Sequence, residues 1–376
     1  MTTIRLSKSC VGQEEKDAVC RVIDAGYLGM GKEVQLFEEE IAAYLGTDLE
    51  VICVNTGTAA LHLALLCLDI GPGDEVLVPS ITYVASFQAI AATGAKPIAC
   101  DVTLDRVFID LEDAAKRLTK HTKAIMPVHY ASDSQDMKSV YAFADANGLR
   151  VVEDAAHAFG GIRNGAYVGT VGDIICFSFD GIKNITSGEG GCILTGDLEL
   201  ARRIKDARLL GVEKDTEKRY QGQRSWSFDV KHQGFRYHMS NLMAAIGREQ
   251  LKKLAYFGMR RNKCVNRYRE SFGCVKEIAL LDFDYENIVS HIFAIRVLNG
   301  RRDDLMKRLR ANNIECGIHY MPNHLLEYFA TSYTLPTAEN LNNEILSLPL
   351  HAELTTTEQD MVINETRDYL SQWQQH

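Results

Sequence analysis

The chain has 376 residues and a mass of 42.0 kDa. This length can bury a substantial core, and we expect two domains, residues 1–245 and 246–376. A hydrophobic content of 46% and a charged content of 24% are typical of a soluble globular protein. The formal charge of −9, from 41 basic and 50 acidic residues, argues against a nucleic-acid-binding protein, although a small anion needs only a local positive site.

The lack of targeting signals and the placement of the cysteines further restrict the class of protein. The N-terminal residues lack the apolar region of a signal peptide, and no apolar run is long enough to span a membrane. The ten cysteines are scattered, without a Cys-x-x-Cys pair, and most lie in apolar segments. We therefore expect a cytoplasmic protein with reduced thiols, and neither a disulfide framework nor a metal site.

The N-terminal segments predict two helices, at residues 13–25 and 34–45, joined by the loop Gly26-Tyr-Leu-Gly-Met-Gly. This loop is either a linker or a place where the backbone approaches a ligand closely. A buried strand at residues 51–54 then runs through Asn55-Thr-Gly-Thr into an Ala/Leu-rich helix. Such a turn directs N–H groups and hydroxyls at the space above the helix N-terminus. A bound phosphate and a ligand-free N-cap are both compatible with it.

Strands and helices alternate between residues 75 and 154. Apolar runs predict strands at 75–79, 96–101, 123–129 and 149–154, and the intervening segments predict helices at 83–92, 110–118 and 136–147. Strands that are apolar throughout indicate a largely parallel sheet covered on both faces. Ligands of such sheets bind at the carboxyl ends of the strands. Asp154 stands at one of these ends, and His157 follows three residues later.

The stretch from Ser178 to Gly191 carries a lysine between two apolar runs, residues 173–179 and 192–195. Its content of Gly, Ser and Thr excludes regular structure. Burial or a nearby cation would lower the pKa of Lys183, and a neutral amine attacks carbonyls to form a Schiff base. Read alone, the stretch favours an ordinary loop lysine beside a tight turn, and the other segments reverse that preference.

The remainder of the chain predicts a smaller α+β unit. A helix at 199–210 is followed by a polar, irregular excursion or lid at 213–231. A long helix at 240–272 leads into the second domain. There we expect strands at 291–298 and 314–320 and helices at 301–312 and 358–370.

An acid, a lysine and a phosphate cradle at the edge of one sheet are what pyridoxal phosphate requires. Lys183 would bind its aldehyde, and Asp154 would hold the proton on its pyridine nitrogen. Tyr83 is available to cover the ring. Ser178 would share the phosphate with Gly57 and Thr58, and His157 would donate to the phenolate oxygen. Each residue alone has a plain structural alternative, as a helix cap or a structural histidine.

Several motifs in order resemble the DegT/DnrJ/StrS family of sugar-nucleotide aminotransferases. They are Asn55-Thr-Gly-Thr-Ala-Ala-Leu, Gly73-Asp-Glu-Val-Leu-Val-Pro-Ser-Ile-Thr-Tyr, Pro127-Val-His-Tyr, Val152-Glu-Asp-Ala-Ala-His, Phe177-Ser-Phe followed by Lys183-Asn and Gly188-Glu-Gly-Gly, and His319-Tyr-Met-Pro. The resemblance covers nearly the whole chain. It implies an α/β aminotransferase of fold type I, similar to aspartate aminotransferase, with a large mostly parallel sheet domain and a smaller C-terminal domain. It also implies a homodimer with shared active sites.

The resemblance also implies roles for individual residues. It makes Lys183 the Schiff-base lysine and supports the roles given above to Asp154, His157, Gly57, Thr58 and Ser178. Substrate-binding residues would be Tyr27, Glu189, His319 and Tyr320. One motif departs from the pattern, because Arg236 stands where the family has an Asn that reaches the partner subunit's phosphate, and His238 replaces an arginine. Arginine still binds phosphate through charge-assisted hydrogen bonds.

The resemblance is closest to enzymes that act at a 4-keto position. Pro127-Val-His-Tyr-Ala and the run Asp180 to Gly191 are similar to those of enzymes that make dTDP-4-amino-4,6-dideoxyglucose for lipopolysaccharide O-antigen, with L-glutamate as amino donor. GDP-perosamine formation and amination of 3-keto sugars are the alternatives. Related sugar dehydratases have His in place of Lys183, so the lysine favours transamination. From another class, a sensor that binds pyridoxal phosphate without turnover is also compatible.

Overall fold

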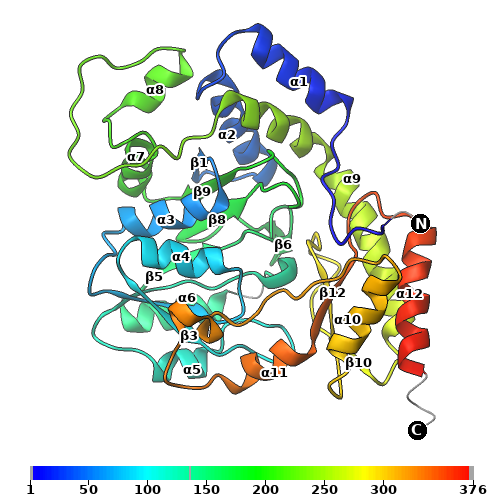
Figure 1. Ribbon diagram of the computed structural model, residues 1–376. Coiled ribbons are helices and arrows are strands. Elements are labelled where there is room, and N and C mark those ends of the chain that lie inside the picture. The colour runs from blue at the N-terminus through cyan, green and yellow to red at the C-terminus, as the bar shows by residue number, and fades with distance from the viewer. Residues whose placement is uncertain (1–2, 135–136, 372–376) are drawn as a thin grey trace.

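The computed structural model describes residues 3–134 and 137–371 and is built around a seven-stranded sheet (Figure 1). The strand order is β1-β9-β8-β5-β4-β2-β3. Strands β3, β2, β4, β5 and β8 are parallel, and β9 runs antiparallel between β8 and β1. The expected mostly parallel sheet is therefore confirmed. The strands are β1 (Glu50–Val54), β2 (Glu75–Pro79), β3 (Lys96–Cys100), β4 (Thr122–Ile125), β5 (Arg150–Asp154), β8 (Ile174–Ser178) and β9 (Gly191–Thr195).

Both faces of this sheet are covered by helices, which explains why buried apolar residues occupy consecutive positions in its strands. In β1, Ile52 and Val54 belong to the core under one set of helices, whereas Val51 and Cys53 belong to the core on the opposite face. The first face is covered by α3 (Gly57–Cys67), α4 (Val84–Ala92) and α7 (Leu198–Ala207). The opposite face packs on α2 (Lys32–Leu45), α5 (Leu111–Lys116), α6 (Lys138–Asn147) and α9 (Asn241–Phe272).

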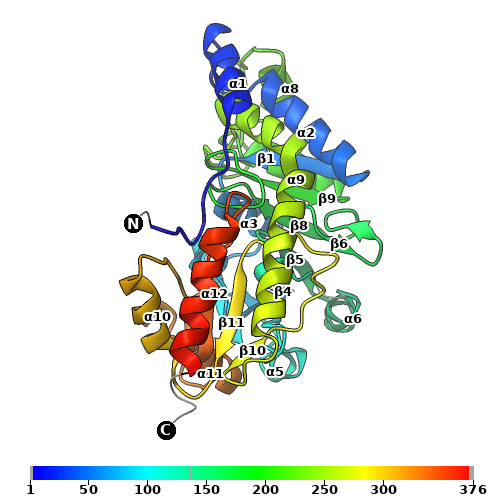
Figure 2. The same ribbon diagram turned by 90° about the vertical axis from the view of Figure 1, so that its right-hand side faces the viewer.

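The 32-residue helix α9 connects the large sheet to the C-terminal part of the chain. Ser240 caps its N-terminus by accepting a hydrogen bond from the Met243 N–H at 3.2 Å. Its first half packs against α1 (Gln13–Asp24) and α2, and its second half lies beside α12 (Thr356–Ser371), as Figure 2 shows. The expected long connecting helix is confirmed.

The C-terminal part contains a second, three-stranded antiparallel sheet in the order β10-β11-β12. Its elements are β10 (Ile278–Leu280), β11 (Phe293–Val297), α10 (Arg302–Ala311), α11 (Pro336–Glu344), β12 (Ile345–Leu348) and α12. The predicted strand at residues 314–320 is wrong, because Ile314 and Gly317 form only isolated bridges. Beyond them the chain leaves the small sheet, since the Tyr130 hydroxyl binds the His319 carbonyl and Asn323 binds the carbonyl of Ser80.

Two further differences concern short segments. The excursion at residues 213–231 contains a helix, α8 (Asp215–Tyr220). A two-stranded ribbon, β6 (Ile162–Arg163) and β7 (Ala166–Tyr167), was not predicted. The first residue of the helix predicted at 136–147, Asp136, lies outside the described residues.

Within the described ranges, no helix combines the length and apolar character needed to cross a membrane.

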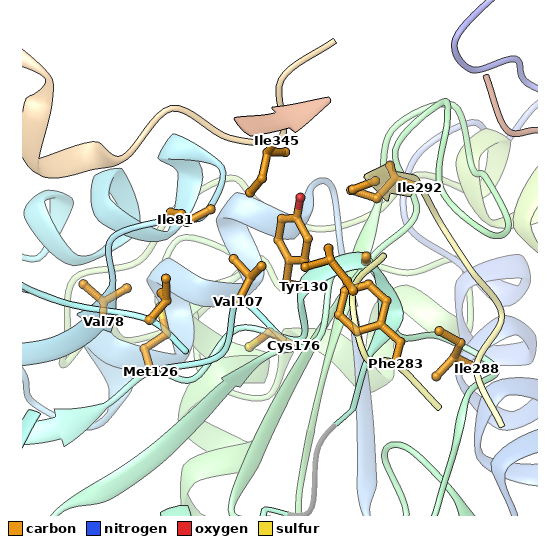
Figure 3. Packing of buried hydrophobic residues seen from close by; sticks show 14 of the residues in the cluster. Val78, Ile81, Val107, Met126, Tyr130, Cys176, Phe283, Ile288, Ile292 and Ile345 are labelled. Carbon is orange, nitrogen blue, oxygen red and sulfur yellow. The ribbon is translucent and has the colours of Figure 1, made fainter. Parts of the chain in front are cut away.

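One hydrophobic cluster joins the large sheet to the C-terminal part. In Figure 3, Tyr130 lies between Val107 and Phe283, with Ile345 of β12 above it. The rings of Tyr130 and Phe283 are 6.3 Å apart, measured between their centroids. The predicted domain boundary at residue 245 stays a prediction. It falls inside α9, and the N-terminal Ile4 pairs with Ile314 of the C-terminal part.

Gly247 of α9 tests how tightly this helix is packed. A Cβ there would lie 2.5 Å from Ser187 Oγ and 2.6 Å from Phe37 Cζ. We expect Gly247→Ala to lower the free energy of unfolding by about 1–3 kcal/mol through overpacking, measured by urea denaturation. Gly258→Ala in the same helix is the control, because its Cβ would be 3.4 Å from Val289, an ordinary contact. Equal stability of the two variants would contradict the packing argument.

Candidate active site

The ends of four strands of the large sheet meet around one cavity. β1, β2, β5 and β8 point the same way, and each is followed at its carboxyl end by residues that line a cavity of about 460 Å³. Gly57, Tyr83, Asp154 and Ser178 come from these four ends. The carboxyl edge is where ligands bind in parallel sheets, so this cavity is the candidate active site.

The turn from β1 into α3 forms a cradle of N–H groups at one side of the cavity. Thr56 caps α3 by accepting a hydrogen bond from the Ala59 N–H at 3.0 Å. The first-turn N–H groups of Gly57 and Thr58 have no partner within the helix, as at any helix start. A Cβ on Gly57 would lie 2.8 Å from Ser178 Cβ. Only glycine therefore lets this turn approach the end of β8, which gives an anion-binding corner at the positive end of a helix.

Asp154 is a buried carboxyl whose hydrogen-bond donors are uncharged. Its Oδ2 accepts from the Ser86 hydroxyl at 2.7 Å, and its Oδ1 accepts from the Ala156 N–H at 3.2 Å. Only 5% of the residue is exposed, and burial raises the pKa of its carboxyl. A buried carboxylate of this kind suits a ligand that brings a positive charge, such as a protonated ring nitrogen.

Lys183 enters the same cavity from the loop between β8 and β9. The next residue, Asn184, fixes this loop by donating to the carbonyls of His157, Phe159 and Val289 at 2.9–3.1 Å. Burial lowers the pKa of the Lys183 amine to about 8. About a tenth of the amine is therefore neutral and nucleophilic at pH 7, far more than for a surface lysine.

Aromatic and imidazole side chains form the rest of the cavity lining. The Tyr320 hydroxyl lies 3.0 Å from His157 Nε2, and the rings of Tyr320 and Tyr83 are 5.6 Å apart. His319 is held by Ser347, whose Oγ is 2.8 Å from its Nδ1. Burial lowers the pKa of His319 to about 4 and the pKa of His157 well below its ordinary value. Both imidazoles are therefore neutral at physiological pH.

The structure brings most of the predicted site residues together and leaves two apart. Ten of them line the cavity: Gly57, Thr58, Tyr83, Asp154, His157, Ser178, Lys183, Glu189, His319 and Tyr320. Tyr27 lies elsewhere, beside Gly31, and its carbonyl accepts from Asn241 Nδ2 at 2.9 Å. Arg236 is exposed and lines another hollow, together with Asp215 and Arg219.

The polar residues at the site that were not predicted include Ser86, Asp180 and His291. Ser86 holds Asp154, Asp180 lines the cavity, and His291 approaches Lys183. The position of Ser86 in the first turn of α4, just after a strand end, was a usable signal. His291 gave none, because it precedes a strand of the C-terminal part. Among the described residues, no group of three or more potential ligands is arranged to hold a metal ion.

Comparison with known proteins places this geometry in a family. The model of the DegT/DnrJ/EryC1/StrS aminotransferase family matches residues 9–367. The chain is 34% identical over 369 residues to the spore coat polysaccharide biosynthesis protein SpsC of Bacillus subtilis, covering 95% of each chain. It is similar to the solved aminotransferase TlmJ of Streptoalloteichus hindustanus at 31% identity and a TM-score of 0.91, covering 99% of this chain and 100% of TlmJ.

Solved relatives also carry the cofactor that the site residues fit. Spr1654 of Streptococcus pneumoniae is solved in a PLP form, at 27% identity and a TM-score of 0.90, with 98% of this chain and 99% of that chain covered. Its PMP form gives 28% identity and the same TM-score, with 98% of each chain covered. The helix-start cradle, the buried carboxyl and the amine of lowered pKa match the phosphate, ring nitrogen and aldehyde of pyridoxal phosphate.

Solved neighbours include sugar aminotransferases. The match to the family model covers nearly all of the chain, and the site holds the groups that its cofactor needs. The chain belongs to the DegT/DnrJ/EryC1/StrS aminotransferase family and is a sugar aminotransferase that depends on pyridoxal phosphate.

Proposed function

We propose that the protein transfers the amino group of L-glutamate to the 4-keto carbon of dTDP-4-keto-6-deoxyglucose. The products are dTDP-4-amino-4,6-dideoxyglucose and 2-oxoglutarate. The observation that carries the amino transfer is the amine of Lys183, with a pKa of about 8, in one cavity with a buried carboxyl and a helix-start cradle. The sugar is inferred from the motifs Pro127-Val-His-Tyr-Ala and Asp180 to Gly191.

A biosynthetic role in lipopolysaccharide O-antigen fits such a product, which we place in the cytoplasm. The relative SpsC is named for polysaccharide biosynthesis, which supports a sugar precursor as substrate. The ten free thiols suit a reducing compartment. GDP-perosamine formation and 3-keto amination remain the competing substrate assignments.

We assign the proton transfers to Lys183. When bound, pyridoxal phosphate supplies an electron sink that stabilises negative charge at the carbon attached to the transferred nitrogen. Asp154 holds the proton on the ring nitrogen, since its carboxylate is buried beside neutral donors. The neutral form of Lys183 removes the α-proton of glutamate and later returns a proton to C4 of the sugar. We assign to His157 a hydrogen bond to the phenolate oxygen, and to Glu189, His319 and Tyr320 contacts with the sugar nucleotide, because all four line the cavity.

Gly57→Ala tests the assignment of the cradle to the cofactor phosphate. The added Cβ would meet Ser178 at 2.8 Å and displace the turn. We expect the affinity for pyridoxal phosphate to fall about ten-fold or more, measured by absorbance titration. Gly181→Ala, in the loop between β8 and β9, is the control, because its Cβ would meet nothing closer than 3.6 Å. Unchanged affinity in Gly57→Ala would place the phosphate elsewhere.

The charges of the cavity support a homodimer with shared active sites. Among the described residues that line it, Asp154, Asp180 and Glu189 are acidic, Lys183 is basic, and none is an arginine. The cofactor and the sugar nucleotide both carry phosphates, so another cation is needed. Arg236 is exposed on a segment that also presents Trp226, which is 90% exposed. We assign Arg236 of a second copy to the phosphate, and Tyr27 to the shared substrate site.

Mixing two inactive variants tests this sharing of sites. Lys183→Ala removes the amine, and Arg236→Ala removes the proposed cross-subunit cation. A mixed dimer would contain one intact site and one site that lacks both groups. After joint refolding we expect activity to recover to about a quarter of the wild-type value, because half of the dimers are mixed. Activity that stays at the level of the separate variants would place Arg236 in the same site as its own Lys183.

The sugar is tested with the pyridoxamine form of the enzyme and a panel of keto-sugar nucleotides. We expect dTDP-4-keto-6-deoxyglucose to restore the absorbance of the lysine-bound cofactor, at about 400–430 nm, fastest of the panel. GDP-4-keto-6-deoxymannose and a 3-keto isomer are the comparison substrates. A faster response to either would replace the proposed sugar. Absence of any response to glutamate by the pyridoxal form would favour a sensor.

A further inference from the structure

The imidazole of His291 lies against the amine of Lys183, although 108 residues separate them in the chain. His291 Nε2 is 3.5 Å from Lys183 Nζ. Only 3% of His291 is exposed, and it stands just before β11, in the C-terminal part of the chain. It is the one hydrogen-bonding partner that Lys183 Nζ has within the described residues. The inference below rests on the proposed role of Lys183.

The position of His291 is fixed from two sides. Its backbone N–H donates to Ser132 Oγ at 3.0 Å, and its carbonyl accepts from Arg261 Nη1 at 3.1 Å. The Ser132 hydroxyl in turn donates to the carbonyl of His157, so one side chain ties the two histidines together. The rings of His157 and His291 are 4.4 Å apart between centroids. These hydrogen bonds fix the backbone of His291, and burial together with the contact with the His157 ring confines its imidazole.

The other groups that face Lys183 are engaged elsewhere or act only through charge. His157 Nε2 is occupied by the Tyr320 hydroxyl, and His319 Nδ1 by Ser347. Asp154 and Asp180 favour the charged amine by their charges, and burial opposes it. The pKa of His291 is far below its ordinary value because of burial and the charge of Lys183, so its ring is neutral. A neutral ring nitrogen accepts a hydrogen bond from an amine without repelling it.

We propose that His291 is a positioning residue for Lys183. Its Nε2 accepts a hydrogen bond from the lysine and holds the free amine inside the cavity. This role applies while the amine of Lys183 is not covalently joined to the cofactor. It requires the ring proton on Nδ1, an atom that has no protein partner in the described residues.

The hydrogen bond has a measurable consequence for the lysine. An acceptor interacts more strongly with an ammonium group than with a neutral amine, so it favours the charged form. Removing the acceptor therefore lowers the pKa of Lys183. Replacing it by another acceptor of similar reach preserves the pKa. If His291 acted only through packing or folding, a replacement that keeps an acceptor and one that lacks it would change the pKa of Lys183 equally.

The experiment compares His291→Leu with His291→Gln in the full-length protein freed of cofactor. The rate of Lys183 acetylation by acetic anhydride is followed against pH by peptide mass spectrometry. We expect the midpoint to fall by about one pH unit or more in His291→Leu and to stay near the wild-type value in His291→Gln. His351→Leu, which removes another buried neutral histidine with no contact to Lys183, should leave the midpoint unchanged.

Steady-state kinetics of the loaded enzyme give a second readout. We expect kcat to fall about ten-fold in His291→Leu with little change in KM for glutamate, and to recover in His291→Gln. An unshifted midpoint in His291→Leu, or equal shifts in both variants, would overturn the proposal. If His291→Leu does not fold, His291→Asn replaces it, because its shorter amide does not reach the lysine and the same shift is expected.

A separate measurement keeps this proposal distinct from the assignment of Lys183. Borohydride reduction of the loaded wild-type protein, followed by peptide mapping, shows which lysine carries the cofactor. An adduct at Lys183 together with an unshifted midpoint in His291→Leu rejects only the role of His291. An adduct at another lysine rejects the proposed mechanism itself.

Discussion

Burial of one amine is the constraint on which the site depends. Lys183 is carried on a loop between two fully buried strands, and this environment disfavours the ammonium form. The loop has to be rigid for this to hold, because a mobile lysine would reach water and regain its ordinary pKa. The three carbonyls that Asn184 binds supply that rigidity. They belong to segments that precede Lys183 and to one that lies far beyond it.

The C-terminal part of the chain completes the site and does not merely flank it. The small sheet supplies His291 just before its central strand, and the segment that leaves it carries His319 and Tyr320 over the strand ends. Tyr130, from the edge of the large sheet, binds the carbonyl of His319 and lies in the hydrophobic cluster shared by both sheets. Burial of that cluster therefore also sets the position of His319 in the cavity.

The acidic side chains of the cavity have the same sign of charge as the phosphate of its cofactor. Three carboxyls and one amine line a site whose cofactor is phosphorylated and whose proposed substrate is a sugar nucleotide. The N–H groups at the start of α3 offset part of this negative charge, because they present partial positive charge without a side chain. An arginine from a second copy of the chain would supply the remaining positive charge. Arg236, which lies on an exposed segment away from its own Lys183, is the arginine that we propose for this role.

The sequence alone determined the periodic features. Apolar runs between short connections predict the parallel sheet, and their carboxyl ends place Asp154, Ser178 and the turn at Gly57 at one edge, because parallel strands share that edge. These are local signals, read from neighbouring residues. The departure of the chain after Gly317 and the contact of His291 with Lys183 were decided only by tertiary structure. Each of them joins segments far apart in the chain, and only packing of the two sheets against each other brings such segments together.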